Sequence, residues 1–556
     1  MKKIYVLVLL AVGMIACTEK NVPDNGGNGN GNGNATDTTT VSPSDTTIVT
    51  TDTIQITWND NSANIVGQHE GVTVTATGGT VNVVSTVKDI TYLLSGAGTG
   101  SLRIEGTNRH QLILRNLTLS CSDGPAINNQ CKKSCFVVLE GTNSLTDGST
   151  YASSEEDRKA AFFSEGQMIF SGSGSLQATG NYKHAIASDD YIQFAESTGS
   201  LTLKAASDGI HANDALYFDG GTFSITAGSD GIQCDSNIII NNGTITISAD
   251  ADGIQSDTAA ITINGGNITI TKAGDKGITA FGDITINDGT IRISSDYKCI
   301  KSGKKENNKV ISAGNISING GDIQVVCNST KTSSGGGSPW GGGSSNTDNN
   351  SPEAIEAKGT ITISDGFVYA QSADDAINAG GDFTISGGYV CAYSTGNDGL
   401  DANGNMYIKG GLVYAIGAGS PEMAIDANSE EQKKLYVQGG TIIALGSLES
   451  GAQLTQACYQ NSSWNANTWY SITVGTETFA FKTPTKSSNN NGSGHGPGGG
   501  SQNTPLVVSG STQPTVKSGV TVNGGTSIFN NMGVMNPTVS AGSTVSLSTY
   551  SSNSRW

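Results

Sequence analysis

Acidic side chains recur at one phase of a repeated Asp-Gly-Ile tripeptide, and they are the residues best suited to chemistry. Its copies begin at Asp208, Asp230 and Asp252. If these residues stack at the spacing of neighbouring β-strands, about 4.8 Å, each pair of carboxylates repels by roughly 1 kcal/mol in water and about 3 kcal/mol at an effective dielectric near 20. Such a row needs protons, lysines or cations, and calcium takes oxygen ligands from carboxylates and turn carbonyls. The sequence therefore predicts calcium at this row.

Further residues extend the predicted metal-binding row. Asp275 lies one residue away from the phase in the next copy. Lys276 and Lys298 enter near the phase in later copies, where they would neutralise the row. The other candidates, which we place at the same phase, are Asp189, Asp190, Asp374, Asp375 and Asp398. A second set, Asp214, Asp235 and Asp257, follows the tripeptides and would line a different edge. The alternative is that Asp-Gly is only a turn pair selected for its backbone geometry.

These residues can meet only if the chain stacks repeating units. Looser copies of the motif end at Ile186, Ile278, Ile300, Ile355, Ile377, Leu400 and Ile425. The spacings are 24, 22, 22, 24 and 22 residues from Ile186 to Ile300 and 22, 23 and 25 residues from Ile355 to Ile425. A glycine-containing dipeptide, such as Gly220-Gly221 or Asn242-Gly243, keeps the same period. Between the markers, alternation as in Phe223 and Ile225 is typical of strands with one buried face.

The repeat predicts an all-β fold, a right-handed single-stranded parallel β-helix with coils of about 22 residues and low-complexity loop insertions. Each coil would hold three short strands and would bury its apolar face only against its neighbours. The right hand is the usual one for parallel connections. A helical solenoid is excluded because no 3.6-residue period is present. A β-sandwich is the structural alternative, which a phase-locked repeat disfavours.

Aromatic residues are candidates for contact with sugar rings. Trp340 lies in a glycine-rich stretch where no β pattern explains it as core. The tyrosines Tyr369, Tyr389, Tyr393 and Tyr414 recur near the later strands and would form a stripe, although alternation would equally place some of them inside. Planar aromatic side chains on a shallow surface are the usual partners of sugar rings, so these five residues are candidates for carbohydrate contact, with core packing as the alternative for the tyrosines.

The first residues are typical of an export signal. Lys2 and Lys3 precede a short apolar run, which is followed by Met14-Ile15-Ala16-Cys17. This order resembles a bacterial lipobox and implies acylation of Cys17, with a plain secretory signal as the alternative. The predicted organisation is a signal peptide at 1–16, the lipidated Cys17 and a flexible linker at 17–53, a β-helix at 54–483 with a low-complexity loop at 329–352, a linker at 484–503 and a C-terminal β segment at 504–556. We expect an exported protein, anchored by lipid in the bacterial envelope at the outer membrane or cell surface.

The overall charge limits the classes of partner that the chain is expected to bind. The chain has 48 Asp and Glu against 30 Lys and Arg, a formal net charge of −18, which disfavours nucleic acid bound through bulk charge. Besides Cys17 there are eight cysteines, for which export permits disulfides, most readily within Cys121, Cys131 and Cys135. Burial as small apolar side chains is equally open.

The region before the regular repeat carries a family resemblance. Its motifs include Gly124-Pro125-Ala126-Ile127-Asn128, the segment from Phe136 to Gly148, and His184-Ala185-Ile186-Ala187-Ser188-Asp189-Asp190. They resemble the carbohydrate-binding-domain family of bacterial lipoproteins, which is similar to the pectate-lyase fold. The resemblance covers roughly residues 54–481 and implies calcium-associated binding of plant-type or other polysaccharides.

These observations leave three functions open. The first is a lipid-anchored, calcium-associated polysaccharide-binding protein. The second is a polysaccharide lyase or hydrolase of the same fold, for which Arg292, Lys298 and Lys301 are candidate bases; paired carboxylates for hydrolysis cannot be singled out. The third is an adhesin or structural stalk without a glycan ligand.

Overall fold

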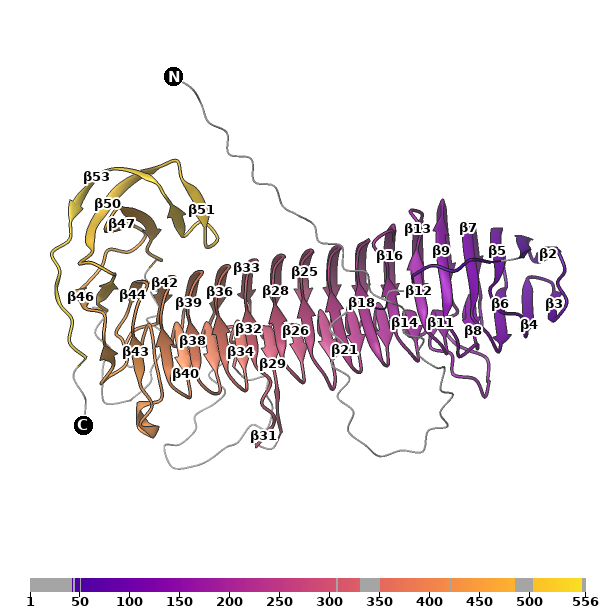
Figure 1. Cartoon of the computed structure of the whole chain (residues 1–556), viewed down its shortest axis with the longest axis horizontal. Coiled ribbons are helices and arrows are strands. Elements are labelled where there is room, and N and C mark those ends of the chain that lie inside the picture. Colours follow the sequence, from indigo (N-terminus) through magenta and orange to yellow (C-terminus); the bar gives the residue numbers. More distant parts are fainter. Residues whose placement is uncertain are drawn as a thin grey trace, which may run out of the picture. The chain divides into compact units, whose positions relative to one another are not determined.

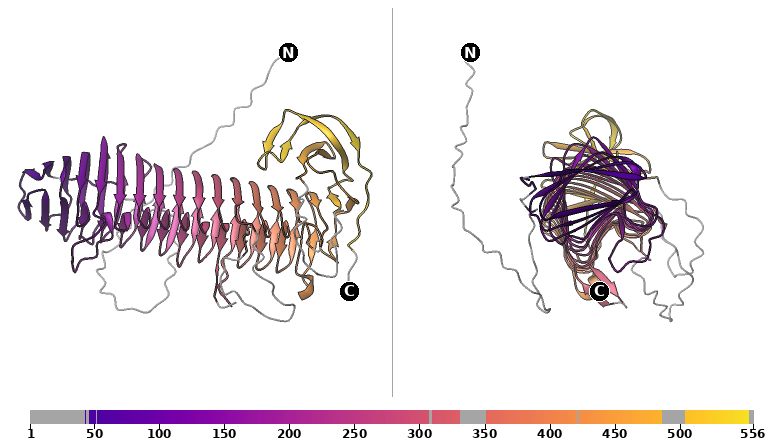
Figure 2. Two further views of the ribbon diagram at one scale, coloured as in Figure 1. Left: turned by 180° about the vertical axis from the view of Figure 1, so that it is seen from behind. Right: turned by 90° about the vertical axis from the view of Figure 1, so that its right-hand side faces the viewer.

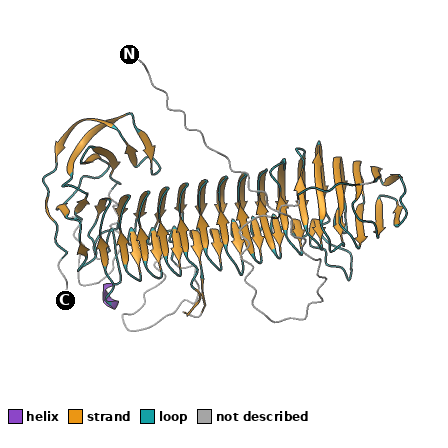
Figure 3. Cartoon of the chain, in the orientation of Figure 1, coloured by secondary structure: helices purple, strands orange, loops and turns teal. Residues whose placement is uncertain are grey.

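The computed structural model describes residues 43, 46–50, 52–306, 309–330, 351–420, 422–485 and 504–552. Cys17, the predicted signal peptide and Trp340 lie outside these residues. The chain divides into the units Met1–Thr39 and Thr40–Trp556, and all described residues belong to the second. Strands dominate this unit, joined by turns (Figure 3). Among the described residues, no helix has the length and apolarity needed to cross a membrane.

Three ladders of mostly parallel strands make up most of the structure, and successive coils follow one another in chain order (Figure 1). Ladder I consists of β3 (Val72–Thr77), β4 (Thr80–Ser85), β6 (Ser101–Gly106), β8 (Ile127–Asn129), β11 (Ala160–Ser164), β14 (His184–Ser188), β17 (Ile210–Ala212), β20 (Ile232–Cys234), β23 (Ile254–Ser256), β26 (Lys276–Ala280), β29 (Lys298–Ser302), β34 (Ile355–Ala357), β37 (Ile377–Ala379) and β40 (Leu400–Ala402).

Ladder II consists of β9 (Cys135–Glu140), β12 (Met168–Ser171), β15 (Ile192–Phe194), β18 (Ala215–Phe218), β21 (Asn237–Ile240), β24 (Ile261–Ile263), β27 (Ile284–Ile286), β32 (Ile316–Ile318), β35 (Ile361–Ile363), β38 (Phe383–Ile385), β41 (Met406–Ile408), β43 (Leu435–Val437) and β45 (Gln453–Leu454). Ladder III consists of β10 (Thr142–Thr146), β13 (Ser175–Gly180), β16 (Ser200–Ala205), β19 (Thr222–Ala227), β22 (Thr244–Ala249), β25 (Asn267–Ala273), β28 (Thr290–Ser295), β33 (Asp322–Cys327), β36 (Phe367–Ser372), β39 (Tyr389–Ser394), β42 (Leu412–Ile416) and β44 (Thr441–Leu445). The end view in Figure 2 shows that successive coils overlie one another. The prediction of an all-β protein with long parallel sheets is confirmed.

Residues at the same phase of the repeat are register partners in ladder I. Ile186 pairs with Ile210, which pairs with Ile232, and the series continues through Ile254, Ile278, Ile300, Ile355, Ile377 and Leu400. The insertion between Ile300 and Ile355 leaves this parallel pairing unbroken. These side chains are fully buried and belong to one continuous apolar core. Burying each isoleucine stabilises the fold by roughly 1.5–3 kcal/mol.

Glycine is required at the two sequence markers for different physical reasons. The second glycine of the dipeptide marker takes a positive φ, for example 93° at Gly221 and 119° at Gly243, which side-chain-bearing residues rarely adopt. The tripeptide glycines are required by close approach instead. A Cβ on Gly209 would lie 2.3 Å from Ile225 Cγ2 and 2.6 Å from the carbonyl oxygen of Gly231. The Asp-Gly pair is therefore more than a generic turn pair.

Hydrogen-bonded side chains also join the coils. Asn264 donates to Asn241 at 2.7 Å, and Asn287 donates to Asn264 at 2.7 Å. Asn319 continues the series by donating to Asn287 at 2.9 Å. The amides satisfy one another at the turn that follows ladder II, where each coil contributes one residue.

Other strands close the two ends of the ladders. At the start are β1 (Thr53–Asp60), β2 (Ser62–Val66), β5 (Ile90–Thr99) and β7 (His110–Ser120), with β1–β2 and β3–β4 antiparallel. At the other end β49 (Leu506–Ser509) pairs antiparallel with β44 and with β46 (Cys458–Asn461), which also pairs with β54 (Ser548–Thr549). A short 3-10 helix, η1, spans Ser429–Glu431.

A separate antiparallel sheet lies in the C-terminal part of the chain. Its strands, in spatial order, are β51 (Thr526–Ile528), β52 (Gly533–Met535), β48 (Glu477–Lys482), β47 (Trp469–Val474), β50 (Thr515–Asn523) and β53 (Thr538–Thr544). The predicted boundary at residue 483 thus falls after β47 and β48, although these strands pair with the C-terminal segment rather than with a coil. A hairpin of β30 (Lys304–Glu306) and β31 (Lys309–Ser312) projects between β29 and β32.

We expect Gly231→Ala to destabilise the fold by about 1–3 kcal/mol, the usual cost of forcing an extra group into a packed core. The new Cβ would lie 2.4 Å from Ile247 Cγ2 and 2.6 Å from the carbonyl oxygen of Gly253. Urea denaturation followed by circular dichroism measures the change. Gly124→Ala is the matched control, since its Cβ would meet nothing nearer than 3.6 Å. Equal midpoints for the two variants would contradict the close-approach argument.

Candidate functional site

Polar side chains of ladder I form two rows, which follow from its register. The turn row holds the residue two positions before the buried apolar residue of each coil: His184, Asp208, Asp230, Asp252, Lys276, Lys298, Glu353, Asp375 and Asp398. The strand row holds the residue directly after that apolar residue, which faces away from the core: His211, Gln233, Gln255, Thr279, Lys301, Glu356, Asn378 and Asp401. Five of the predicted metal ligands, Asp208, Asp230, Asp252, Asp375 and Asp398, therefore share one row.

Carboxylates of the turn row are bound to the backbone of the neighbouring coil. Oδ1 of Asp208 accepts the backbone N–H of Asp230 at 3.1 Å, and Oδ1 of Asp230 accepts that of Asp252 at 2.8 Å. Asp375 accepts the N–H of Asp398 at 3.0 Å. One oxygen of each carboxylate thus helps to hold the coils together. The second oxygen is not needed for this bond, so a structural role and a ligand role are compatible.

Burial makes several of these carboxyl groups weak acids. It raises the pKa of Asp230 to about 7, although the hydrogen bond from the backbone N–H of Asp252 opposes the increase. Burial likewise raises the pKa of Asp252 to about 6, and Lys276 limits that increase. For Asp375, burial and the adjacent Asp374 raise the pKa to about 8. These three carboxyl groups therefore titrate near neutral pH, and a cation would compete with protons for their oxygens.

Lysines interrupt the acidic row in its middle. Nζ of Lys276 lies 2.5 Å from Asp275 and 3.8 Å from Asp252. Lys298, whose side chain is 1% exposed, pairs with Glu353 and lies 3.0 Å from Glu356. Asp275 itself lies one residue before the turn row, as does Asp374. The interruption divides the acidic residues into two groups with different surroundings.

The fold does not bring the three candidate bases of a lyase together on one ladder. Arg292 belongs to β28 in ladder III and pairs with Asp322 there, whereas Lys298 and Lys301 belong to β29 in ladder I. The two glutamates around Lys298 raise its pKa despite the opposing effect of burial. A base must lose its proton near neutral pH, and Lys298 is held in its protonated form.

Beyond the lysines, carboxylates converge in what we call the acidic end cluster: Asp398, Asp401 and Asp426, together with Glu449. Ligand atoms of the first three all lie within 4.8 Å of one another. Burial raises the pKa of Asp398 and of Asp401 to about 7. Burial and a hydrogen bond with Glu449 raise the pKa of Asp426 to about 10. Of these residues, only Asp398 was predicted from the sequence. The shared apolar-acidic order of the pairs Leu400-Asp401, Ile425-Asp426 and Leu448-Glu449 indicates the other three.

The donor set of the acidic end cluster fits calcium. Calcium binds oxygen at about 2.3–2.6 Å, so two oxygens on one ion lie no more than about 5 Å apart. The 4.8 Å limit among Asp398, Asp401 and Asp426 satisfies this condition. Asn378 Nδ2 donates to Asp401 at 3.0 Å and to Asp375 at 2.9 Å, which ties the cluster to the preceding coil. Carboxylates that hold protons in the absence of a cation are suitable ligands for one.

Asp189 and Asp190 occupy a different phase from the one predicted. They follow the buried Ile186 of β14, whereas turn-row residues precede it. Asp189 instead accepts a hydrogen bond from Asn213 at 3.5 Å, and the backbone of Asp190 pairs with that of Asp214. They therefore align with the predicted second edge, which also contains Asp235 and Asp257. An Asp pair before a strand and one after it look alike in sequence, which explains the difference.

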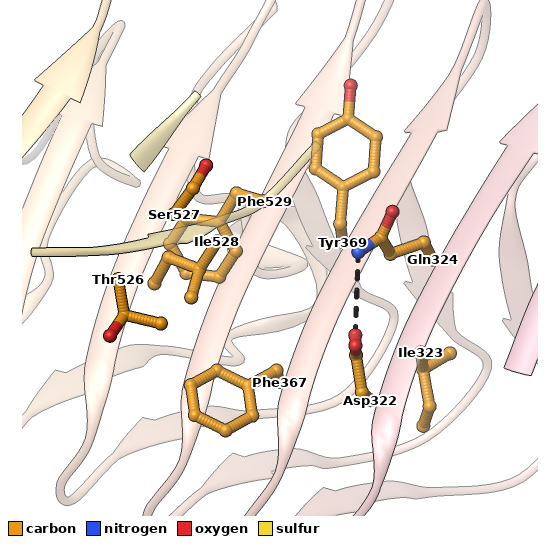
Figure 4. Close-up of a pocket in the computed structure, with 9 residues that line it drawn as sticks. All are labelled: Asp322, Ile323, Gln324, Phe367, Tyr369, Thr526, Ser527, Ile528 and Phe529. Atoms are coloured by element: carbon orange, nitrogen blue, oxygen red, sulfur yellow. Dashed lines mark hydrogen bonds between the residues drawn. The ribbon is translucent and has the colours of Figure 1, made fainter. Parts of the chain in front are cut away.

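The predicted tyrosine stripe faces the C-terminal sheet. Tyr369 and Tyr414 are 2% and 0% exposed, and the hydroxyl of Tyr414 donates to the carbonyl oxygen of Lys482 at 3.0 Å. Tyr389 and Tyr393 are half-buried at the edge of the same apolar cluster. Figure 4 shows the pocket on this side, where Phe367 and Tyr369 face Ile528 and Phe529. Packing against the C-terminal sheet thus covers the rings of Tyr369 and Tyr414.

Another aromatic pair is better placed for a sugar. Tyr407 and Tyr436 lie on the outward side of ladder II, with ring centroids 5.0 Å apart and an interplanar angle of 10°. Lys409 Nζ lies 5.1 Å from the centroid of Tyr407. Both tyrosines are partly exposed. Sequence reasoning missed them, although the alternation in Met406-Tyr407-Ile408 and Leu435-Tyr436-Val437 points both rings outward.

A shallow hollow lies beside the lysine interruption, and we call it the lysine groove. It is lined by Asp252, Gln255, Ser256, Asp257, Lys276, Thr279, Ala280, Phe281, Lys301, Gly303, Lys304 and Lys305. Polar side chains of both rows therefore meet the projecting hairpin β30–β31 here. The groove offers hydrogen-bond donors, acceptors and positive charge on a chain that is acidic overall.

We expect the metal-free protein to become less stable as pH rises from about 4 to about 7. The ordinary pKa of an Asp is 3.8, whereas Asp398 and Asp401 have pKa values near 7 when folded. The folded chain therefore binds more protons than the unfolded chain in this window, and its free energy of unfolding falls with pH. At pH 8, calcium should restore stability, by about 2.7 kcal/mol at 100 times its Kd.

Thermal unfolding at pH 5 and pH 8, with calcium and with chelator, measures this effect. The double variant Asp401→Asn, Asp426→Asn should lose the calcium response and part of the pH dependence. Asp288→Asn, on an exposed turn, is the control. Calcium stabilisation that survives in the double variant would place the ion elsewhere.

Comparison with known proteins gives two matches. A model of the family described as "Carbohydrate-binding domain-containing protein" matches residues 83–321 and 272–399, which together span more than half of the 556 residues. A solved structure, "Structure of the polysaccharide lyase-like protein from C. thermocellum, Gadolinium derivative", has 18% sequence identity and a TM-score of 0.32, and the match covers 50% of this chain and 95% of that chain. No curated protein matches the chain.

The family match covers the ladders from β6 to β39, including the turn row from His184 to Asp398 and the lysine groove. It also covers the motifs on which the resemblance was based, from Gly124 to Asp190. This chain belongs to the family of carbohydrate-binding domain-containing proteins.

Proposed function

We propose that the chain is a lipid-anchored, calcium-associated polysaccharide-binding protein of the bacterial envelope. The observation that carries this proposal is the lysine groove beside the two polar rows of ladder I, within a chain of a carbohydrate-binding family. Neutral and acidic sugars are bound through several polar side chains on an open surface. A ladder repeats such side chains at a regular spacing, which suits a repeating polymer.

The lysine groove favours an acidic polysaccharide over a neutral one. Lys276 and Lys301 come from the neighbouring strands β26 and β29, where Lys301 pairs in register with Thr279, while Lys304 and Lys305 come from the hairpin. A uronate carboxylate would meet these ammonium groups, while Gln255 and Thr279 would bind its hydroxyl groups. The net charge of −18 still disfavours nucleic acid. Local charge, rather than total charge, would select the ligand.

In this proposal, calcium acts chiefly by stabilising the fold. The acidic end cluster joins three consecutive coils through Asp401, Asp426 and Glu449, whose preceding residues are bridged in register. An ion there would remove the repulsion among these carboxylates and fix the end of ladder I. A second use, bridging the protein to a sugar carboxylate, is compatible with the partial exposure of Asp401 and Asp426.

The remaining parts of the proposal rest on the sequence. We propose a right-handed single-stranded β-helix with coils of about 22 residues, supported by the register partners of ladder I. Acylation of Cys17, with the linker at 17–53, would hold the domain at the outer membrane or cell surface. Globomycin, which blocks lipoprotein signal processing, should cause an unprocessed precursor to accumulate in cells if Cys17 is acylated.

The central experiment is retention of the protein on a panel of immobilised polysaccharides, including polygalacturonate and cellulose. We expect retention on at least one glycan, and weaker retention when a chelator replaces calcium. Retention on none in either condition would contradict the proposal and favour an adhesin or stalk. Release of unsaturated sugars during the assay would instead support the lyase alternative.

A variant of the lysine groove tests where the glycan binds. Lys305→Ala should weaken binding to polygalacturonate by about 1 kcal/mol, roughly fivefold, because it removes one partly screened charge interaction. Lys517→Ala, on the exposed side of β50, is the matched control. Affinity electrophoresis in polygalacturonate gels compares the two variants at equal net charge. Equal mobility shifts would remove the groove from the binding surface.

A further inference from the structure

Two histidines and one aspartate meet at the first coils of the regular repeat. His184 begins β14, Asp208 holds the same turn-row position in the next coil, and His211 follows in β17. Ligand atoms of the three side chains lie within 4.8 Å of one another. No part of the proposed glycan or calcium chemistry uses the two imidazoles.

The nitrogens of both rings face the same carboxylate oxygen. Nδ1 of His184 lies 3.1 Å from Oδ2 of Asp208, and Nδ1 of His211 lies 3.6 Å from that oxygen. Ligands around a tetrahedral zinc ion, with bonds near 2.0–2.1 Å, are about 3.3 Å apart. The two observed distances lie on either side of this value. The other oxygen of Asp208, Oδ1, remains engaged with the backbone of Asp230.

The site is enclosed and contains an orphaned nitrogen. The side chains of His184, Asp208 and His211 are 8%, 9% and 15% exposed. Nδ1 of His211 is buried without a hydrogen-bond partner among the described residues, and 3.6 Å is too long for a hydrogen bond to Asp208. A buried nitrogen lone pair or N–H without a partner is costly, and metal coordination would satisfy it.

We infer that His184, Asp208 and His211 form a binding site for a borderline divalent metal ion of the zinc class, separate from the calcium chemistry of the acidic end cluster. Imidazole nitrogen suits zinc, whereas calcium takes oxygen ligands. Three protein ligands leave a fourth position, which water would reach past the exposed edge of His211. The stacked rings, now inclined by 17° at a centroid distance of 4.5 Å, must turn so that both Nδ1 atoms point at the ion.

Charges near the site are compatible with a cation. Lys159 acts electrostatically on His184, and its Nζ lies 2.6 Å from Asp189 and 3.6 Å from Asp157, which offset its charge. Asp208 presents its oxygen Oδ2 to both imidazoles, where a cation would bind it.

The chain itself supplies a conservative variant for the test. The strand-row residues that follow His211 in register are Gln233 and Gln255, so His211→Gln places a residue that this position accepts in two neighbouring coils. Asp208→Asn keeps an oxygen for the N–H of Asp230 while removing the charge. Folding of both variants is checked by circular dichroism and by the unfolding midpoint.

The experiment uses the full chain, stripped of metal and dialysed against zinc, with cobalt as a spectroscopic probe. We expect about one zinc ion per chain and a visible cobalt absorption typical of tetrahedral nitrogen and oxygen ligands. His211→Gln and Asp208→Asn should bind more than about 10-fold more weakly. His69→Ala, at a histidine that pairs with Asp52 near the start of the ladders, should bind as the unchanged chain does.

Three outcomes would overturn the inference: no stoichiometric zinc, zinc unaffected by His211→Gln, or octahedral cobalt spectra in every variant. Excess calcium should leave zinc bound, because the two ions prefer different donors. Zinc binding and glycan retention are measured separately, so failure of one does not decide the other.

Discussion

Parallel register between coils is the constraint on which the rest of this structure depends. It places residues of equal phase one above another at the strand spacing of about 4.8 Å, whatever their chemical type. For Ile210 and Ile232 the result is a continuous buried stack. For Asn264 and Asn287 it is a chain of amide hydrogen bonds. For the turn-row carboxylates the same spacing forces like charges together in a poorly solvated place, so backbone N–H groups, lysines and protons must offset the repulsion.

The sequence predicts the ladders well because their determinants are local and repeated. The phase of Ile186 to Leu400 and the aspartates at Asp208, Asp230 and Asp252 could be aligned by counting alone, and the structure pairs them in that alignment. The features that the repeat alone could not predict depend on contacts between segments that are distant in the sequence. Tyr414 is covered by a sheet whose strands lie after the last coil, and Asp426 joins Asp401 only through isolated bridges in an irregular coil. Asp189 differs for another reason, since its side of the strand was not evident from the motif.

The two polar rows of ladder I therefore carry two donor chemistries. Near His184 the neighbours of a carboxylate are imidazole nitrogens, whereas around Asp401 they are other carboxylates. Lys276 and Lys298 separate the two regions and neutralise their own neighbours. Because every coil presents its turn residue from nearly the same backbone geometry, a single substitution changes the local chemistry without changing the fold. The acidic character of the chain is thus compatible with a locally basic groove.

The antiparallel strand β49 has a consequence for association between molecules. A ladder of parallel strands ends in unpaired backbone N–H and C=O groups, and another copy of the same ladder would match them. Because β49 covers β44 with the opposite chain direction, ladder III does not end in a parallel edge. The hairpins β1–β2 and β3–β4 reverse direction in the same way at the first coils. Reversal at both ends limits growth of a structure whose repeating geometry would otherwise favour end-to-end fibres.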